Sequence, residues 1–131
     1  MIKHHKTFKT MALTLLLSGF GALALGGTAQ AVDYYGAIAF SQTTGAHGYA
    51  YDYTTQRQAE INAMAECRKY GRGCEFATWV RNGCAALAVG NNEGWGGDWG
   101  NNRREAENKA LSRCRQHTRG CQIRRWVCTS R

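Results

Sequence analysis

The sequence predicts an α+β domain in which two tandem β-β-α-β repeats form one pseudo-twofold unit, with helices packed on a mainly antiparallel sheet. Three observations lead to this prediction. Six residues recur at an offset of 47 positions, which indicates an internal duplication. The chain has six cysteines and no proline. Its 131 residues and apolar fraction of 44% suit one folded domain rather than two domains or a disordered chain.

The first 31 residues have the pattern of a secretory signal peptide. Three lysines precede an apolar stretch over residues 11–25, and Ala29-Gln30-Ala31 gives the small residues required at a cleavage site. An uncleaved membrane anchor is the alternative, because the uncharged run is just long enough to span a bilayer. Glycine and polar residues interrupt that run. We therefore expect cleavage after Ala31 and a secreted or periplasmic domain at residues 32–131.

The positive charge is distributed unevenly. The whole chain carries a net charge of +8, and residues 103–131 contain nine of the basic residues against only two glutamates. Residues 32–102 are slightly acidic. We expect one electropositive end, which is either a solvated face or a contact for an acidic partner, an anionic envelope polymer or lipid headgroups. Export argues against nucleic acid as the partner.

The cysteines indicate a disulfide framework. All six follow residue 31, and an even number in an exported chain reads as three bridges. A zinc site is disfavoured, since there is no Cys-x-x-Cys pair and neither His47 nor His117 has ligand spacing. An even set also leaves no spare thiol for catalysis. We predict no metal and no cofactor. The six are Cys67, Cys74, Cys84, Cys114, Cys121 and Cys128.

The duplication places the two repeats at about residues 36–84 and 85–131. An Ala-Glu-x-x-Ala pattern, a Cys-x6-Cys pair and a tryptophan all recur at the 47-residue offset. Upstream, the apolar run 37–40 corresponds to 86–89 with a slightly different offset. The recurring residues are Ala59, Glu60, Ala63, Cys67, Cys74 and Trp79, which answer to Ala106, Glu107, Ala110, Cys114, Cys121 and Trp126.

Each repeat begins with a predicted hairpin. The apolar run 37–40 is followed by a glycine-containing turn at 45–48 and by tyrosines at every second position from Tyr49 to Tyr53. Alternating aromatics are typical of one face of a strand. The second copy, residues 94–100, contains so much glycine that its strand pattern is less clear.

A helix and a final strand complete each repeat. Thr55 with Gln58, and Asn102 with Glu105, have the spacing of helix caps. Small residues then recur every fourth position up to a cysteine, which lets each helix lie close to a sheet. The final strands are expected at 76–80 and 123–127. The two stripes are Ala59, Ala63 and Cys67, and Ala106, Ala110 and Cys114.

The same symmetry predicts the disulfide pairs. Each Cys-x6-Cys spacing joins a helix end to the next strand, giving the pairs 67–74 and 114–121. Cys84 and Cys128 each follow a Trp-Val strand, which leaves the pair 84–128. Loop entropy gives about 2.5 kcal/mol for each local bridge and about 4 kcal/mol for the long one.

Several of these segments resemble a known family. Ala37-Ile38-Ala39-Phe40-Ser41, the run Gly83-Cys84-Ala85-Ala86-Leu87-Ala88-Val89-Gly90, the helix ending in Cys114, and Trp126-Val127-Cys128 are similar to the exported bacterial domain-of-unknown-function family 4189. The resemblance covers nearly all of residues 32–131. It implies a bacterial, exported, disulfide-bonded domain, and it brings no catalytic residues with it.

Few residues suggest chemistry. Asp52 and Asp98 occupy similar places beside aromatics, either as a carboxylate pair of the glycosidase type or as turn residues, and we favour turns. His47 has no matching residue in the second repeat and no nucleophile at fixed spacing, so a turn role is favoured over a base. His117 follows a helix end, where a cation suits the dipole.

Binding is therefore the function expected from the sequence. The aromatics either cover the sheet opposite the helices or form a contact surface, and the predicted contacts are Trp95, Trp99, Arg103 and Arg104. We expect no enzyme but an exported, non-catalytic module that engages another protein, as an inhibitor, an immunity protein or a host-interaction factor. The alternative is an envelope- or wall-associated module that binds anionic polymer or glycan. A third possibility is a small hydrolase.

Overall fold

The computed structural model describes residues 26–27 and 30–130, so most of the predicted signal segment lies outside the described residues. The described chain has the order β-β-α-β twice, as the duplication predicts. The first repeat comprises β1 (Tyr35–Ser41), β2 (His47–Tyr53), α1 (Gln56–Tyr70) and β3 (Cys74–Arg81). The second comprises β4 (Cys84–Val89), a short 3-10 turn η1 (Asn91–Glu93), β5 (Trp95–Gly100), α2 (Arg103–Arg115) and β6 (Gln122–Cys128).

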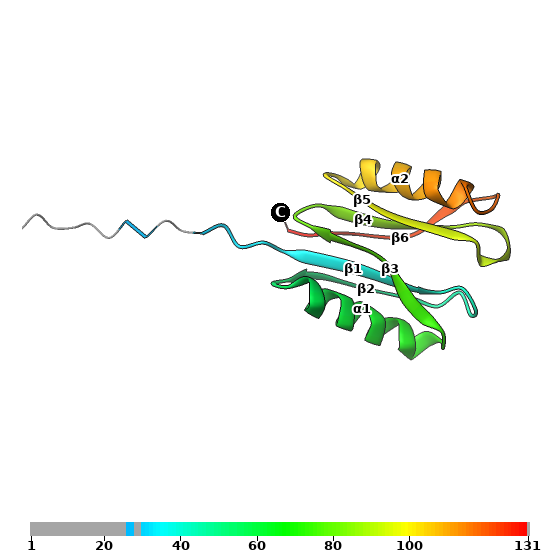
Figure 1. The fold of residues 1–131 in the computed structure, drawn as a ribbon, viewed down its shortest axis with the longest axis horizontal. Helices are drawn as coiled ribbons and strands as arrows, with labels where there is room; N and C mark the ends of the chain where they lie inside the picture. Colours follow the sequence, from blue (N-terminus) through cyan, green and yellow to red (C-terminus); the bar gives the residue numbers. More distant parts are fainter. Residues whose placement is uncertain (1–25, 28–29, 131) are drawn as a thin grey trace, which may run out of the picture.

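The strands form two antiparallel sheets, one from each repeat. Their orders are β2-β1-β3 and β5-β4-β6, with the first strand of each repeat at the centre. The sheets are stacked face to face, and each helix covers the outer face of its own sheet (Figure 1). The result is a sandwich of four layers, α1, sheet, sheet and α2. The α+β prediction is confirmed, whereas the sequence had suggested a single sheet.

The central strands explain why there are two sheets. Every residue of β4 and all but the first of β1 are buried, so each central strand must be covered on both faces. In β1 the alanines face α1, while Ile38 and Phe40 face the other sheet. In β4, Leu87 and Val89 likewise enter the layer between the sheets. Small residues thus meet the helices and large ones form the inter-sheet core.

The helices begin and pack as predicted. The backbone N–H of Gln58 donates to Thr55 Oγ1 at 3.2 Å, and that of Glu105 donates to Asn102 Oδ1 at 2.9 Å. The two small-residue stripes are fully buried. Close approach also requires glycine on the strands. A Cβ atom at Gly96 would lie 2.3 Å from the backbone nitrogen of Cys114, which explains why so glycine-rich a segment is nevertheless a strand.

The structure contains the three disulfides that the repeat symmetry predicts. Two of them, Cys67–Cys74 and Cys114–Cys121, join the end of a helix to the start of the following strand. The third, Cys84–Cys128, joins cross-strand partners of β4 and β6. Each small disulfide ring therefore encloses the turn that follows its helix.

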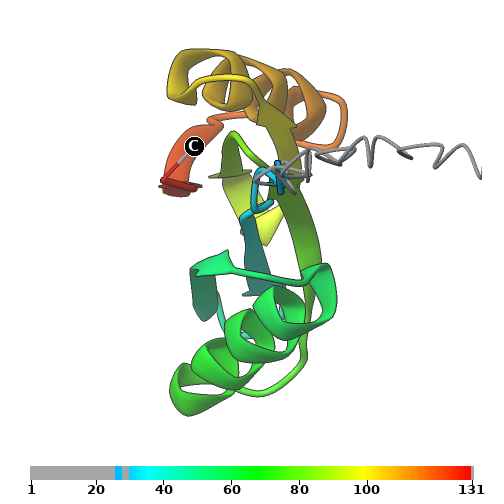
Figure 2. The same ribbon diagram turned by 90° about the vertical axis from the view of Figure 1, so that its left-hand side faces the viewer.

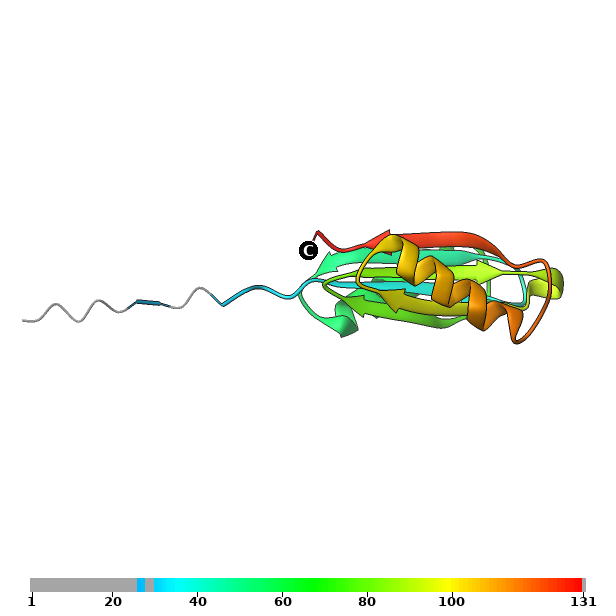
Figure 3. The ribbon, with the colours of Figure 1, turned by 90° about the horizontal axis from the view of Figure 1, so that it is seen from above.

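Different segments of the chain lie at the two ends of the sandwich. β1 begins and β6 ends at the same end (Figures 1 and 3). We call the opposite end the distal end. It comprises the turns 42–46 and 90–94 together with the loops 71–73 and 116–121 that follow the two helices. Seen along the strands, β3 lies beside β5 on one side of the sandwich, and β2 and β6 lie on the other (Figure 2).

Candidate binding grooves

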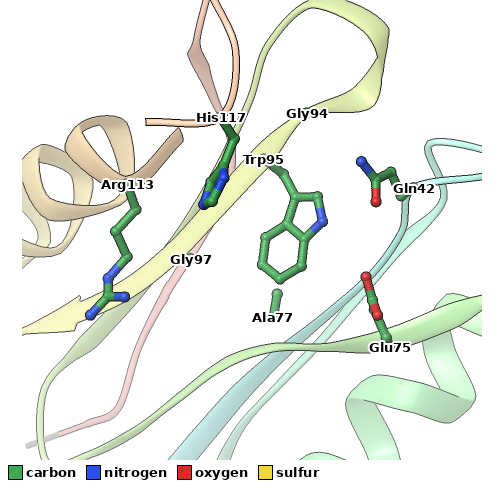
Figure 4. Close-up of a pocket in the computed structure, with 9 residues that line it drawn as sticks. Gln42, Glu75, Ala77, Gly94, Trp95, Gly97, Arg113 and His117 are labelled. Carbon is green, nitrogen blue, oxygen red and sulfur yellow. The ribbon is translucent and has the colours of Figure 1, made fainter. Parts of the chain in front are cut away.

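A pocket of about 470 Å³ opens near the distal end, at the seam between β3 and β5. We call it the Trp95 groove. The Trp95 indole lies at its centre, with Glu75 and Gln42 to one side and Arg113 and His117 towards α2 (Figure 4). The groove is lined by Gln42, Glu75, Ala77, Gly94, Trp95, Gly96, Gly97, Arg113 and His117.

Core packing positions the tryptophan. Trp95 is the first residue of β5, and its ring meets Phe40 edge-on, with centroids 6.0 Å apart. Trp95 is thus partly a core residue and partly the floor of the groove. Gly97 keeps the seam narrow beside it, since a Cβ atom there would lie 2.7 Å from the Ala77 carbonyl oxygen. The glycines that weakened the strand prediction therefore let β5 approach both α2 and β3.

Three polar side chains around the ring are available to a ligand. In the described part of the chain, no hydrogen bond or ion pair engages the side chains of Gln42, Glu75 or His117. Arg113 is different, because its Nε lies 2.5 Å from the Asp98 carboxylate. The groove therefore offers an aromatic surface with an uncommitted amide, carboxylate and imidazole, which together can both donate and accept hydrogen bonds.

The first repeat has a corresponding pocket of about 470 Å³, which we call the Tyr49 groove. The strand pairing of the first repeat matches that of the second. In the β1–β2 pair, His47 and Tyr49 occupy the positions that Trp95 and Gly97 occupy in the β4–β5 pair. This groove contains a cation of the chain itself, since the Arg125 guanidinium stacks 4.3 Å from the Tyr49 ring centroid. The grooves are related in position and differ in chemistry.

Arg125 makes the Tyr49 groove electropositive. Its Nη2 lies 3.3 Å from His47 Nε2, and its Nε is buried without a hydrogen-bond partner in the described part of the chain. Burial lowers the pKa of His47 below its ordinary value, and the positive charges of Arg125 and then Arg124 lower it further. At neutral pH the ring is therefore neutral and can accept a hydrogen bond from the guanidinium.

The four predicted contact residues do not form one cluster. Trp99 is half exposed on β5 and lines a hollow with Trp79 and Arg81. Arg103 is engaged, since it pairs with Glu107 at 2.7 Å and lies 4.0 Å over the Trp126 ring. Arg104 is exposed in the first turn of α2. Trp95 and Trp99 share the β3–β5 seam, whereas Arg103 stacks on a strand at the other side.

The predicted carboxylate pair does not form. Asp52 accepts hydrogen bonds from the backbone N–H and the hydroxyl of Ser130, at 2.7 and 2.5 Å. Asp98 is bound to Arg113 instead. Both lie in strands rather than in the turns we had favoured. The left-handed backbone of Asp52, with φ of 61°, also ends the tyrosine alternation, so that Tyr53 packs on the helix side.

The described residues contain neither a metal-ligand cluster nor a helix that could span a bilayer. Within residues 26–27 and 30–130, no group of three or more histidine, cysteine or acidic side chains could hold a metal ion. In the same part of the chain, neither helix has the length and apolarity needed to cross a bilayer.

Fold and grooves define a class of protein, a small disulfide-bonded α+β sandwich with surface grooves beside its edge strands. Within that class, the chain belongs to the family described as a domain of unknown function (DUF4189), whose pattern matches residues 35–128. Among solved structures it is similar to the NMR structure of Rv1813c from Mycobacterium tuberculosis. That similarity has 26% identity and a TM-score of 0.53, and it covers 98% of each chain. No functionally curated protein matches the chain.

Sequence reasoning missed most of the Trp95 groove. Gln42 and Glu75 were not singled out, and His117 was assigned only to a helix end. The duplication did contain a signal for the groove, at equivalent positions where the two repeats carry different residues. His117 stands 47 residues after Tyr70, and Arg113 stands 47 after Glu66. Both pairs face the equivalent grooves, so divergence between the repeats marks the pocket walls.

Proposed function

We propose that the chain is an exported, non-catalytic binding module that engages another protein outside the cytoplasm, in an inhibitory, immunity or host-interaction role. Export rests on the signal pattern of residues 1–31, with cleavage after Ala31 and release to the periplasm or the medium. Three disulfides suit an oxidising compartment.

The observation that carries the proposal is the β3–β5 seam. Three tryptophans lie along it, with Trp95 in the groove and Trp79 and Trp99 around the neighbouring hollow. Trp99 is 50% exposed and Trp79 is 41% exposed. Tryptophan is enriched at the energetic centres of protein interfaces, where a rigid ring buries a large area at small entropic cost. Uncommitted polar groups beside these rings add directional hydrogen bonds.

A binding role also suits the state of the three titratable groups that the sequence had suggested for chemistry. Asp52 and Asp98 are held by separate partners, and His47 is engaged with Arg125. Acid–base catalysis needs such groups to converge on one reacting atom. In the described part of the chain, these three side chains bind separate partners and do not converge on one point.

Affinity capture tests the proposal. The exported, oxidised protein would be used to capture partners from envelope and host extracts, followed by mass spectrometry and titration of the captured protein. Trp99→Ala should weaken that affinity at least about tenfold, as for an interface anchor. Tyr51→Ala is the matched control, since Tyr51 lies at the corresponding place on β2 and is 52% exposed. Its affinity should stay within about twofold.

Two results would contradict the proposal. If Trp99→Ala and the wild type bound the captured protein with equal affinity, the β3–β5 seam would not be part of the interface. Turnover of a wall or protein substrate by the pure wild-type protein would show that the module is an enzyme.

A further inference from the structure

The two small disulfide rings share two arginines in addition to the cysteines and the glycine that the fold requires. Each reads Cys-Arg-x-x-x-Arg-Gly-Cys, with the bridge closing the first cysteine onto the last. Both arginines of each ring are exposed. The duplication has therefore kept two guanidinium groups in each ring, at matching positions. They are Arg68 and Arg72 in the first ring, and Arg115 and Arg119 in the second.

The backbone that carries these arginines is held firmly. The Arg72 carbonyl accepts a hydrogen bond from Ser41 Oγ at 2.5 Å, and the Arg119 carbonyl accepts one from the Asn91 backbone N–H at 2.8 Å. Next in each ring comes a glycine in the left-handed region, Gly73 or Gly120, with φ of 73° or 69°. The ring, the hydrogen bond and the turn together limit the backbone entropy that these segments lose on binding a ligand.

Among the described residues, no acidic side chain neutralises these arginines. In the described part of the chain, none of the four takes part in an ion pair. Other cations near the distal end are partnered, for example Lys69 with Glu66 at 3.0 Å and Arg113 with Asp98. The helix dipole accounts for Arg68 and Arg115, which lie at the helix C-termini. Arg72 and Arg119 lie beyond the ends of their helices, so the helix dipole does not explain the second arginine of each ring.

We propose that the two rings together form a binding surface for a linear anionic polymer bearing carboxylate or phosphate groups. Both rings lie at the distal end, one beside each helix end (Figure 1). The planar guanidinium group binds carboxylate and phosphate through paired N–H donors. Two rigid rings separated by the width of the sandwich can engage charged groups at two distant points of one long polymer, and this raises the effective affinity.

A polymer fits the surface better than a lipid bilayer does. Interfacial membrane binding combines basic residues with an apolar face that enters the headgroup region. The only large hydrophobic side chain within the two rings is Tyr70. The second ring adjoins the Trp95 groove through His117. The Trp99 hollow shares no residue with either ring, so Trp99→Ala tests the protein contact without changing the ring surface.

The chain supplies a matched control. Arg57 and Arg104 are also 47 residues apart and exposed, and neither has an ion-pair partner in the described residues. They lie in the first turns of α1 and α2, at the opposite end of the sandwich. R72Q/R119Q and R57Q/R104Q therefore remove the same charge from opposite ends.

The test is titration of the exported, oxidised protein with polygalacturonate, which carries carboxylates, and with polyphosphate, at several salt concentrations. R72Q/R119Q should weaken binding about tenfold. It should also lower the slope of log K against log salt concentration by about two, because two fewer counterions are released. R57Q/R104Q should change affinity less than about threefold. Comparison of the two probes identifies the preferred anionic group. Circular dichroism and thermal midpoints verify that both variants are folded.

Three outcomes would overturn the inference. Equal losses in both variants would show attraction by bulk charge rather than by the rings. Absence of binding to either polymer at physiological ionic strength would remove the proposed ligand class. Tighter binding to phosphatidylglycerol vesicles than to both polymers, lost in R72Q/R119Q, would make the surface a membrane contact. Trp99→Ala should leave polymer binding unchanged, which separates this test from that of the protein interface.

Discussion

The three disulfides should differ in their contribution to stability, and the order can be worked out from the chain. Cys84–Cys128 closes a sequence separation of 44 residues, whereas Cys67–Cys74 closes one of 7. The loop-entropy relation then gives about 4 kcal/mol for the long bridge and about 2.5 kcal/mol for the short one. Replacing both cysteines of a bridge by alanine should therefore cost about 1.5 kcal/mol more at the long bridge.

Urea unfolding of oxidised protein measures this difference. C84A/C128A should show the lower midpoint, and its m-value should rise because the denatured chain loses its longest cross-link and expands. C114A/C121A serves as the internal comparison. Its bridge spans the same separation of 7, so it should match C67A/C74A within about 0.5 kcal/mol.

One result would refute the reasoning. If C67A/C74A were destabilised as much as C84A/C128A, the bridges would act mainly in the folded state, by holding helix ends to strands. The entropy of the unfolded chain would then not set the order of stability.

Three further predictions concern packing, protonation and capping. Gly96→Ala should lower the free energy of unfolding by about 2 kcal/mol or more in thermal unfolding, because its Cβ atom would meet the Cys114 backbone; an unchanged midpoint would contradict this. The pKa of His47 is lowered in the fold, so the unfolded chain binds the proton more tightly and stability should fall as pH drops below the ordinary histidine pKa. Urea midpoints should show a weaker pH dependence in His47→Gln, and identical profiles would argue against this role. Asn102→Ala should cost about 1 kcal/mol in urea unfolding through loss of the α2 cap, and no loss would mean that the cap contributes nothing.

The sequence predicted the framework of this fold because the framework depends on local spacing. Helix caps, small-residue stripes and paired cysteines all recur at the 47-residue offset. Each of these features depends only on residues close together in the sequence, so its structure can be predicted from spacing. The stacking of two sheets was harder to predict. It follows from alternation of small and large residues in β1, where Ala37 and Ala39 face the helix while Ile38 and Phe40 face the other sheet. That alternation is present in the sequence, but an apolar run is typical of any buried strand.

The candidate site was less accessible to sequence reasoning. Trp95 was selected for its glycine-rich surroundings, but its polar neighbours Gln42 and Glu75 come from the first repeat, far away in the chain. Their meeting depends on how sheets from different repeats are stacked, which no local pattern records. Arg103 was selected for its charge, although its guanidinium is occupied by Glu107 and Trp126. Whether a side chain is free to bind a ligand depends on its contacts in the folded structure, which the sequence pattern does not record.

The inter-sheet core also bears on the evolutionary origin of the domain. A single β-β-α-β repeat would leave the inner face of its sheet, with residues such as Ile38 and Phe40, open to water. A half-length ancestor would therefore have been a homodimer held together by that face. Gene fusion through the turn between β3 and β4 would have turned the dimer into one polypeptide. Once linked, the copies no longer had to be identical, so one pocket could acquire Trp95 while in its twin Arg125 came to stack on Tyr49.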